Sequence, residues 1–356
     1  MTNLERLEMA VEAAGLDALL LMDDKNIFYA TGFMPTDSAA LVAPGAAYLV
    51  TDSRYIEAAE KQCVPGVEVI LTTRERPLLS CLKDLAEGRA AARLGAEEEY
   101  LSHAMYLRVE KALGLELIPA QDIVTGLRRS KSPAELESLV AAQRIAERAL
   151  EEVLPLIKPG VSERSIAAEI TYRMLRHGAE GNSFDPIVVA GPKSSMPHGV
   201  PGDELIKDGD FVTMDFGCIK NGYCSDMTRT VAVGHATEEM RNVYETVLRA
   251  QLAGIAAARP GASGADIHNA AAAVIAEAGY GAYFGHGFGH GVGLYIHEAP
   301  NASPLNPAPM PEGAVISAEP GIYLPGRFGV RIEDVLYLTG DGNVDITKAP
   351  KELLIL

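Results

Sequence analysis

Three of the eight histidines in this chain lie within sixteen residues, in the segment GHGFGHGVGLYIHEAP at positions 285–300. Five glycines share that segment. Glycine lets a backbone pass close to other groups, at a cost in conformational entropy, so a stretch of this kind usually serves a site. The spacing of His286, His290 and His297 does not by itself say whether the site binds a metal, a phosphate or nothing.

Two aspartates in the segment 209–234 could bind a cation. Asn-Gly at 221–222 lies between two β-rich runs and favours a two-residue type I′ turn of a β-hairpin. Counting outward from this turn puts Gly217 opposite Asp226, so that Asp215 lies on the same face as Asp226 and diagonal to it, about 7–8 Å away at the backbone. Aspartate is disfavoured in strands, which makes a shared cation one interpretation. Two solvent-exposed aspartates, or a bulge that changes the register, are the alternatives.

The segment AVISAEPGIYLPGRFGVRIEDVLYL (314–338) adds two glutamates. Glu319 is expected at the end of its first β-rich run and Glu333 inside the second, with Arg331 on the same face as Glu333. A glutamate within an apolar strand is costly to bury unless it is paired or coordinates a metal. Arg331 could pair with one of the carboxylates, and a purely structural Arg–Glu bridge remains open.

Four carboxylates and an imidazole could not share one site without cations. Two divalent ions would balance the charge, and an oxygen-rich ligand set with one nitrogen suits Mn²⁺, Co²⁺, Fe²⁺ or Zn²⁺. Such a pair of ions clamps a bridging hydroxide and stabilises a tetrahedral oxyanion in aminopeptidases and phosphatases. Spacing alone does not establish that these residues converge.

The elements that must position these residues fall into two domains. Residues 1–125 alternate helical and strand patterns and form an α/β unit, with helices at 78–88 and 102–114 and buried strands at 16–22, 46–52, 67–73, 92–97 and 115–120. A second domain, residues 126–356, opens with a helix marked by Ser132, Pro133 and Glu135, which have the spacing of a capping box.

The second domain contains an internal repeat. Residues 158–178 align without a gap onto residues 259–279, and in each copy a Pro-Gly turn leads into a Ser-capped helix that ends at glycine. Chance similarity is the alternative, since Pro-Gly-x-Ser starts many helices. Gly-rich strand material with a histidine follows each copy, His198 in the first and the segment 285–300 in the second. Two related halves would place a site between them.

Composition excludes several classes of partner. A net charge of −17 argues against nucleic acid and against an anionic membrane surface. No apolar run has the length of a membrane span, and the first residues lack a signal-peptide core. Four cysteines in 356 residues are not a disulfide framework. We expect a cytoplasmic protein.

The motifs MDFGCIKNGYCSDMTRT, GHGFGHGVGLYIHEAP, AEPGIY and GVRIED together resemble the signatures of the pita-bread metallopeptidases, specifically the Xaa-Pro branch of prolidase and aminopeptidase P. The resemblance covers nearly the whole chain. It implies an α+β protein in which residues 1–125 form a creatinase-type N-terminal α/β domain. Residues 126–356 would form the duplicated α/β, pita-bread catalytic domain.

The resemblance also implies roles for individual residues. Two divalent ions, Mn²⁺ first among them, would be bound by Asp215, Asp226, His290, Glu319 and Glu333, with Asp226 and Glu333 each contacting both. Glu319 would double as general base. His297 would donate to the substrate carbonyl, and His198, in SSMPHG, matches the family's other catalytic histidine. His286 and Arg331 would contact or support the bound substrate.

The activity that follows is hydrolysis of the Xaa-Pro bond, in dipeptides or at the N-terminus of peptides with proline second, by a homodimer. The alternatives are metal-free relatives, such as a creatinase-like amidinohydrolase or a non-catalytic binding module. The five filled ligand positions oppose both. Methionine aminopeptidase shares the ligands but lacks this N-terminal domain. None of the motifs separates a dipeptidase from an aminopeptidase.

Overall fold

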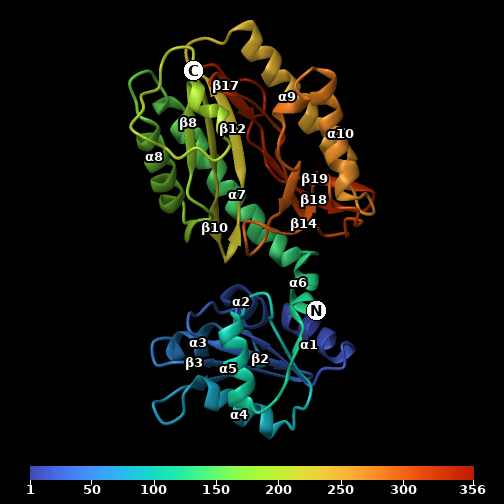
Figure 1. Cartoon of the computed structure of the whole chain (residues 1–356). Helices are drawn as coiled ribbons and strands as arrows, with labels where there is room; N and C mark the ends of the chain where they lie inside the picture. The colour runs from blue at the N-terminus through green and yellow to red at the C-terminus, as the bar shows by residue number, and fades with distance from the viewer. The chain divides into compact units, whose positions relative to one another are not determined.

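The computed structural model describes all residues, 1–356, and divides into two compact units, Met1–Arg128 and Arg129–Leu356. Figure 1 shows the first in blue to cyan and the second in green to red. The predicted boundary after residue 125 falls inside helix α6 (Gln121–Arg128), which belongs wholly to the first unit.

The first unit is built on a mixed six-stranded sheet of order β4-β3-β2-β1-β5-β6, in which β2 pairs antiparallel with both β1 and β3. Its strands are β1 (Ala18–Leu21), β2 (Ala39–Ala43), β3 (Ala46–Thr51), β4 (Val67–Leu71), β5 (Leu94–Ala96) and β6 (Leu117–Pro119). Its other helices are α1 (Asn3–Ala13), α2 (Asp24–Thr31), α3 (Ile56–Gln62), α4 (Leu78–Gly88) and α5 (His103–Leu113).

All five strands expected in this unit are present, and β2 is an addition to them. The run AALVA of β2 is short and uniformly apolar, and periodicity cannot assign such a run to a strand. The expectation that β4 is buried is wrong. This strand lies at the edge of the sheet, where none of its residues is fully buried.

The second unit contains four small sheets flanked by long helices. The helices are α7 (Pro133–Val153), α8 (Glu163–Arg176), α9 (Glu238–Ala257) and α10 (Gly264–Glu277), with 3-10 turns η1 (Leu154–Leu156), η2 (Gly191–Ser195) and η3 (Gly281–Tyr283). The strands are β7 (Gly181–Asn182), β8 (Ile187–Ala190), β9 (Phe211–Phe216), β10 (Cys218–Lys220), β11 (Tyr223–Cys224), β12 (Met227–Ala232), β13 (Gly289–Gly291), β14 (Glu298–Ala302), β15 (Val315–Ala318), β16 (Gly321–Leu324), β17 (Phe328–Arg331), β18 (Asp334–Thr339) and β19 (Gly342–Asp345).

The sheets have the orders β11-β10-β7, β12-β9-β8, β14-β13-β15-β18-β19 and β16-β17. Helices α7 and α8 share an apolar core with β8, β9 and β12, whereas α9 and α10 share a second core with β15 to β18 (Figure 1). Each half therefore pairs two helices with its own strands.

The internal repeat is visible in the structure. Helices α8 and α10 begin and end 101 positions apart, as the alignment predicts, and are capped by Ser162 and Ser263. An isolated bridge ties each cap to a later strand-like residue, Ser162 to Leu205 and Ser263 to Pro309. The same helix start recurs with an antiparallel bridge at the same serine, which supports duplication over chance similarity.

Two long hairpins bring the sheets together, and both bend in the middle. In the first, Asn221 and Gly222 have φ of 51° and 78°, as a type I′ turn requires. The predicted register holds beyond the bend, because Asp215 pairs with Thr228. The second hairpin runs from β15 through β16 and β17 into β18, and its strands change sheet halfway.

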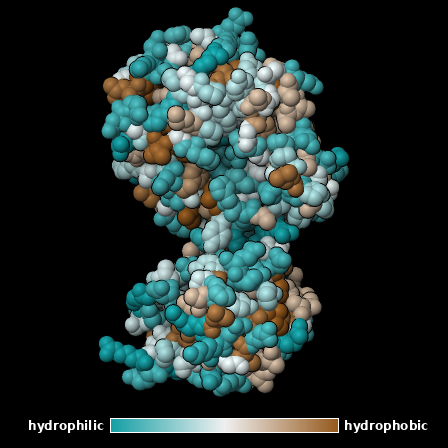
Figure 2. All heavy atoms as spheres, viewed as in Figure 1, coloured by the Kyte–Doolittle hydropathy of each residue, from teal (hydrophilic) through white to brown (hydrophobic).

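No helix is long and apolar enough to span a membrane. Hydrophilic residues cover most of the visible face of each unit, and apolar residues form small separate patches (Figure 2).

Candidate metal centre and active site

The four carboxylates lie at or near the bends of the two hairpins. Asp215 belongs to β9 and Asp226 to the break between β11 and β12. Glu319 follows β15, and Glu333 occupies the break between β17 and β18. The expectation that Glu333 lies inside a strand is therefore wrong: the run that contains it pairs with β16 before the break and with β15 after it.

His290 enters the same space from the glycine-rich segment. Its strand, β13, passes so close to β15 that a Cβ on Gly289 would lie 1.9 Å from the carbonyl oxygen of Ser317. The Oγ of Ser317 accepts a hydrogen bond from the backbone N–H of His290 at 3.0 Å. Phe288, fully buried against Gly254 of α9, anchors this segment and contributes about 1.5–3 kcal/mol by burial. Glycine thus permits the close approach that the sequence predicts.

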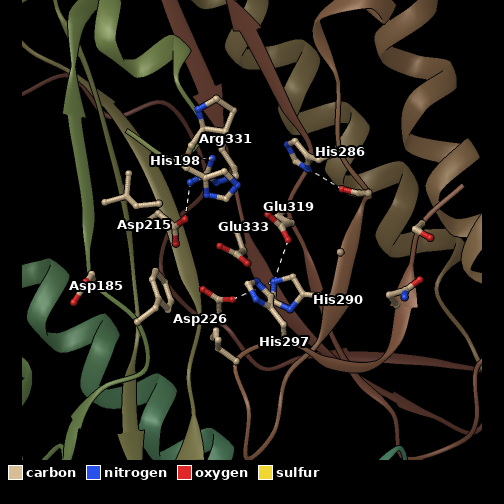
Figure 3. Close-up of a pocket in the computed structure, with 18 residues that line it drawn as sticks. Asp185, His198, Asp215, Asp226, His286, His290, His297, Glu319, Arg331 and Glu333 are labelled. Carbon is tan, nitrogen blue, oxygen red and sulfur yellow. Dashed lines mark hydrogen bonds and ion pairs between the residues drawn. The ribbon is translucent and has the colours of Figure 1, made fainter. Parts of the chain in front are cut away.

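These side chains converge (Figure 3). Ligand atoms of Asp226, His290 and Glu333 all lie within 4.8 Å of one another. His290 Nε2 is 3.2 Å from Glu319 Oε1 and 3.6 Å from Asp226 Oδ2. Asp215 Oδ1 is buried without a hydrogen-bond partner. A buried acidic cluster with an orphaned oxygen and one imidazole fits divalent cations, because buried charges are otherwise paired.

The electrostatics of the cluster lead to the same conclusion. Burial, reinforced by neighbouring carboxylates, raises the pKa of both Asp226 and Glu333 well above the usual range. Burial acts in the same direction on Glu319, but its hydrogen bond to His290 and the charge of that ring lower the pKa of Glu319 to about 2. Without cations, protons on some carboxyl groups must relieve the repulsion, and cations would displace those protons.

Arg331 supports the cluster from one side. Its side chain is 4% exposed, and Nη2 donates to Asp215 Oδ2 at 2.6 Å. Nε donates to Thr228 Oγ1 at 3.0 Å, and Thr228 donates in turn to Glu333 Oε2 at 2.8 Å. Arg331 therefore fixes two carboxylates, one directly and one through a hydroxyl.

Tyr323 is absent from the sequence prediction of the site. Its hydroxyl lies 2.9 Å from Arg331 Nη1 and 3.0 Å from His286 Nε2. The alternation of side chains along a strand could have predicted Tyr323. Gly321 pairs with Arg331, and Tyr323 is two residues further along the same face of the hairpin. It joins the predicted residues His286 and Arg331 into one network.

The remaining predicted histidines line a cavity of about 600 Å³ beside the cluster. The ring of His297 packs edge-on against that of His290, with centroids 4.2 Å apart. His198 and His286 lie elsewhere on the wall. All predicted site residues line this cavity, and sequence reasoning missed several others on its wall, namely Phe184, Asp185, Ile187, Ile296, Asn301 and Ser303.

Comparison with known proteins identifies the family. Residues 137–340 match metallopeptidase family M24, and residues 3–130 match the creatinase/prolidase N-terminal domain. The chain belongs to metallopeptidase family M24 and is a hydrolase with the pita-bread fold, as its motifs predict.

Proteins named Xaa-Pro dipeptidase and X-Pro aminopeptidase are both among those similar to this chain. The chain is 36% identical to the Xaa-Pro dipeptidase of Pyrococcus furiosus, over 99% of both chains. The solved structure of the Xaa-Pro dipeptidase from Bacillus anthracis is 40% identical with a TM-score of 0.94, over 99% of each chain. The X-Pro aminopeptidase from Thermotoga maritima is 35% identical with a TM-score of 0.93, over 98% of this chain and all of that one.

Proposed function

We propose that this chain is a dinuclear metal-dependent exopeptidase that hydrolyses the bond before proline, in Xaa-Pro dipeptides or at the N-terminus of longer peptides. The observation that carries the proposal is the buried cluster of four carboxylates and one imidazole, which opens onto a cavity lined by three further histidines. The named activities of the relatives supply the substrate class.

The residues that would hold the two ions in this proposal are Asp215, Asp226, His290, Glu319 and Glu333. Mn²⁺ is the ion we favour, and Co²⁺, Fe²⁺ or Zn²⁺ would suit the same donors. When bound, two such ions supply an activated hydroxide and stabilise charge on the carbonyl oxygen.

The protein's own groups handle protons and position the peptide. Glu319 lines the cavity 3.2 Å from His290, and its carboxylate would act as general base toward the attacking water. Partial desolvation lowers the pKa of His297, so its ring is neutral at neutral pH and can donate a hydrogen bond to the developing oxyanion.

Three further residues complete the proposed site. His198 faces the same cavity, where it can contact the bound peptide. His286 and Arg331, joined through Tyr323, would hold the wall against which the substrate lies. Apolar side chains of the wall, Phe184, Ile187 and Ile296, suit an apolar ring such as that of proline.

Turnover of Xaa-Pro, Xaa-Pro-Yaa and Ala-Ala substrates tests the proposal, in enzyme stripped with chelator and reloaded with Mn²⁺ or Co²⁺. We expect no turnover without metal, recovery at two ions per chain, and a requirement for proline. The ratio of dipeptide to tripeptide turnover distinguishes a prolidase from an aminopeptidase P. Equal hydrolysis of Ala-Ala and Ala-Pro would refute the proline assignment, and full activity without metal would refute the mechanism.

We also propose a homodimer, as the family resemblance implies. Sedimentation of the active enzyme tests this, and a fully active monomer would refute it.

A further inference from the structure

The loop that carries His198 is held at its base by a buried carboxylate outside the metal cluster. His198 lies between the end of β8 at Ala190 and Gly202, and its imidazole makes no hydrogen bond within the protein. The position of this ring in the cavity therefore depends on the backbone of the loop, residues 191–202. Whatever fixes this loop also fixes His198.

Glu163, the first residue of α8, closes this loop. Its side chain is fully buried. Oε1 accepts the N–H of Ala190 at 2.8 Å, where the loop begins, and Oε2 accepts the N–H of Gly202 at 3.0 Å, where it ends. Oε2 also accepts a hydrogen bond from Lys193 Nζ at 2.7 Å, inside the loop. Hydrogen bonds to an ionised acceptor are roughly twice as strong as neutral ones, so a single side chain ties the loop's two ends together.

The far side of the loop is fixed by residues near the candidate site. Ser194 Oγ accepts the N–H of Gly329 at 2.9 Å, and a Cβ on Gly329 would lie 2.3 Å from the carbonyl oxygen of Ser194. The guanidinium of Arg331 lies 3.4 Å from the carbonyl oxygen of Pro197, next to His198. The loop is thus clamped between Glu163 at its base and Arg331 at its tip.

The second copy of the internal repeat forms the same helix start without a carboxylate at this position. The position equivalent to Glu163 in the second half, 101 residues later, is Gly264. A Cβ there would lie 2.3 Å from the carbonyl oxygen of Asn301, and the neighbouring loop is closed by Asn306, whose Nδ2 donates to that same oxygen at 2.6 Å. The buried glutamate occurs only in the half that carries His198.

We propose that Glu163 is a positioning residue for the reaction, which acts on the substrate through His198 by holding the loop 191–202 in place. The inference rests on the proposed role of His198. Glu163 makes no contact with the five candidate metal ligands, so its removal should change turnover without changing metal binding.

The test is Glu163→Gln, which keeps the shape of the side chain but replaces one acceptor oxygen with a donor that faces N–H groups. The matched control is Glu204→Gln. Glu204 Oε2 also accepts from Lys193 Nζ, at 3.1 Å, but its side chain is 62% exposed. Both substitutions are made in the wild type and in His198→Ala, and kcat, KM, Mn²⁺ affinity by calorimetry and amide hydrogen exchange of residues 191–202 are measured.

We expect Glu163→Gln to lower kcat by roughly 10–100-fold, the order of loss that misplacing a reacting group by about 1 Å produces. Mn²⁺ affinity should stay unchanged, exchange of the loop should accelerate, and Glu204→Gln should resemble the wild type. In the His198→Ala background the same substitution should add little, because two residues that act as one unit are not additive.

Equal losses from Glu163→Gln in both backgrounds would overturn the inference and leave the role of His198 intact. A His198→Ala enzyme with normal turnover would instead refute the proposed role of His198 itself. Should Glu163→Gln fold poorly, Lys193→Met weakens the clamp while leaving both backbone contacts. It should then give a smaller loss of kcat that again disappears without His198, and a loss that persists there would count against the clamp.

Discussion

Replacing His290 and His297 separately by alanine tests the roles proposed for these two adjacent imidazoles. His290 is proposed as a metal ligand and His297 as a hydrogen-bond donor to the oxyanion. The rings touch, with centroids 4.2 Å apart, yet they face different groups. His290 Nε2 lies between Glu319 and Asp226 at 3.2 and 3.6 Å, as a metal ligand should. His297 makes no such contact with a carboxylate and is exposed in the cavity. We expect His290→Ala to weaken metal binding and His297→Ala to slow the chemical step.

The magnitudes differ enough to be separated. Loss of one oxyanion donor costs on the order of 10²–10³ in kcat, about 2.7–4 kcal/mol, so His297→Ala should fall in that range with little change in KM. Because the side chain is exposed, the same substitution should change the free energy of unfolding by no more than about 0.5 kcal/mol. That corresponds to a shift of about 1–2 °C in Tm for a unit of this size.

His290→Ala should show the opposite pattern. Replacing a residue that hydrogen-bonds a metal ligand typically lowers metal affinity by about 10–100-fold. Replacing a ligand itself should lower the affinity at least as much. Added Mn²⁺ should then partly restore the rate of His290→Ala and have no such effect on His297→Ala.

The assay measures metal content by elemental analysis after dialysis, kcat on an Ala-Pro substrate, and Tm by calorimetry for both variants side by side. A stable, metal-replete His297→Ala enzyme with near-normal kcat would refute the donor role. Parallel loss of Tm and kcat in that variant would mean that the ring only packs against its neighbour. Full metal occupancy of His290→Ala would remove His290 from the ligand set.

Three further outcomes are expected. Burial raises the pKa of Asp226 and Glu333, so the folded metal-free protein binds more protons than the unfolded chain above about pH 4, and its stability should fall as pH rises. Glu319 opposes this trend only below about pH 5, so the Tm of chelated enzyme should fall increasingly behind that of Mn²⁺-loaded enzyme from about pH 5 to about pH 8. Arg229→Met should lower the free energy of unfolding by about 3–5 kcal/mol in urea denaturation, because it removes one of the two cationic partners of buried Asp334, Lys351 being the other, and takes the Arg229 donors from four backbone carbonyl oxygens. Gly289→Ala should lower Mn²⁺ affinity in a calorimetric titration, since its Cβ would meet the Ser317 carbonyl at 1.9 Å, whereas the control Gly285→Ala meets nothing within 4 Å and should bind normally.

Local chemistry made much of the site predictable. The Asn-Gly turn at 221–222 fixes the register of its hairpin, and from that register the shared face of Asp215 and Asp226 follows by counting. The position of Glu333 could not be found in this way, because alternation along a strand does not reveal where the strand leaves one sheet for another. Tyr323 was within reach of the same counting, since it lies on the face of Arg331.

Other features depend on distant parts of the chain. The strand β2 has no alternation, and only its place between β1 and β3 makes it a strand. Glu163 stands in an ordinary helix start, and nothing local shows that its carboxylate meets the N–H groups of Ala190 and Gly202. Such contacts become visible only when the fold brings the segments together.

The bends of the hairpins explain how five ligands from distant segments come to share one space. A strand that changes sheet leaves backbone groups without ladder partners at the bend, and buried backbone groups must be satisfied elsewhere. The N–H of Glu333 bonds the carbonyl of Thr228 at 3.1 Å, which joins the two hairpins, and the N–H of Glu319 bonds that of Phe288 at 2.8 Å, which joins the second hairpin to the histidine segment. The backbones of the ligand-bearing segments are thus tied to one another by main-chain hydrogen bonds. Because these bonds hold the ligand backbones in place, they restrict the freedom that the five side chains would otherwise lose on binding cations.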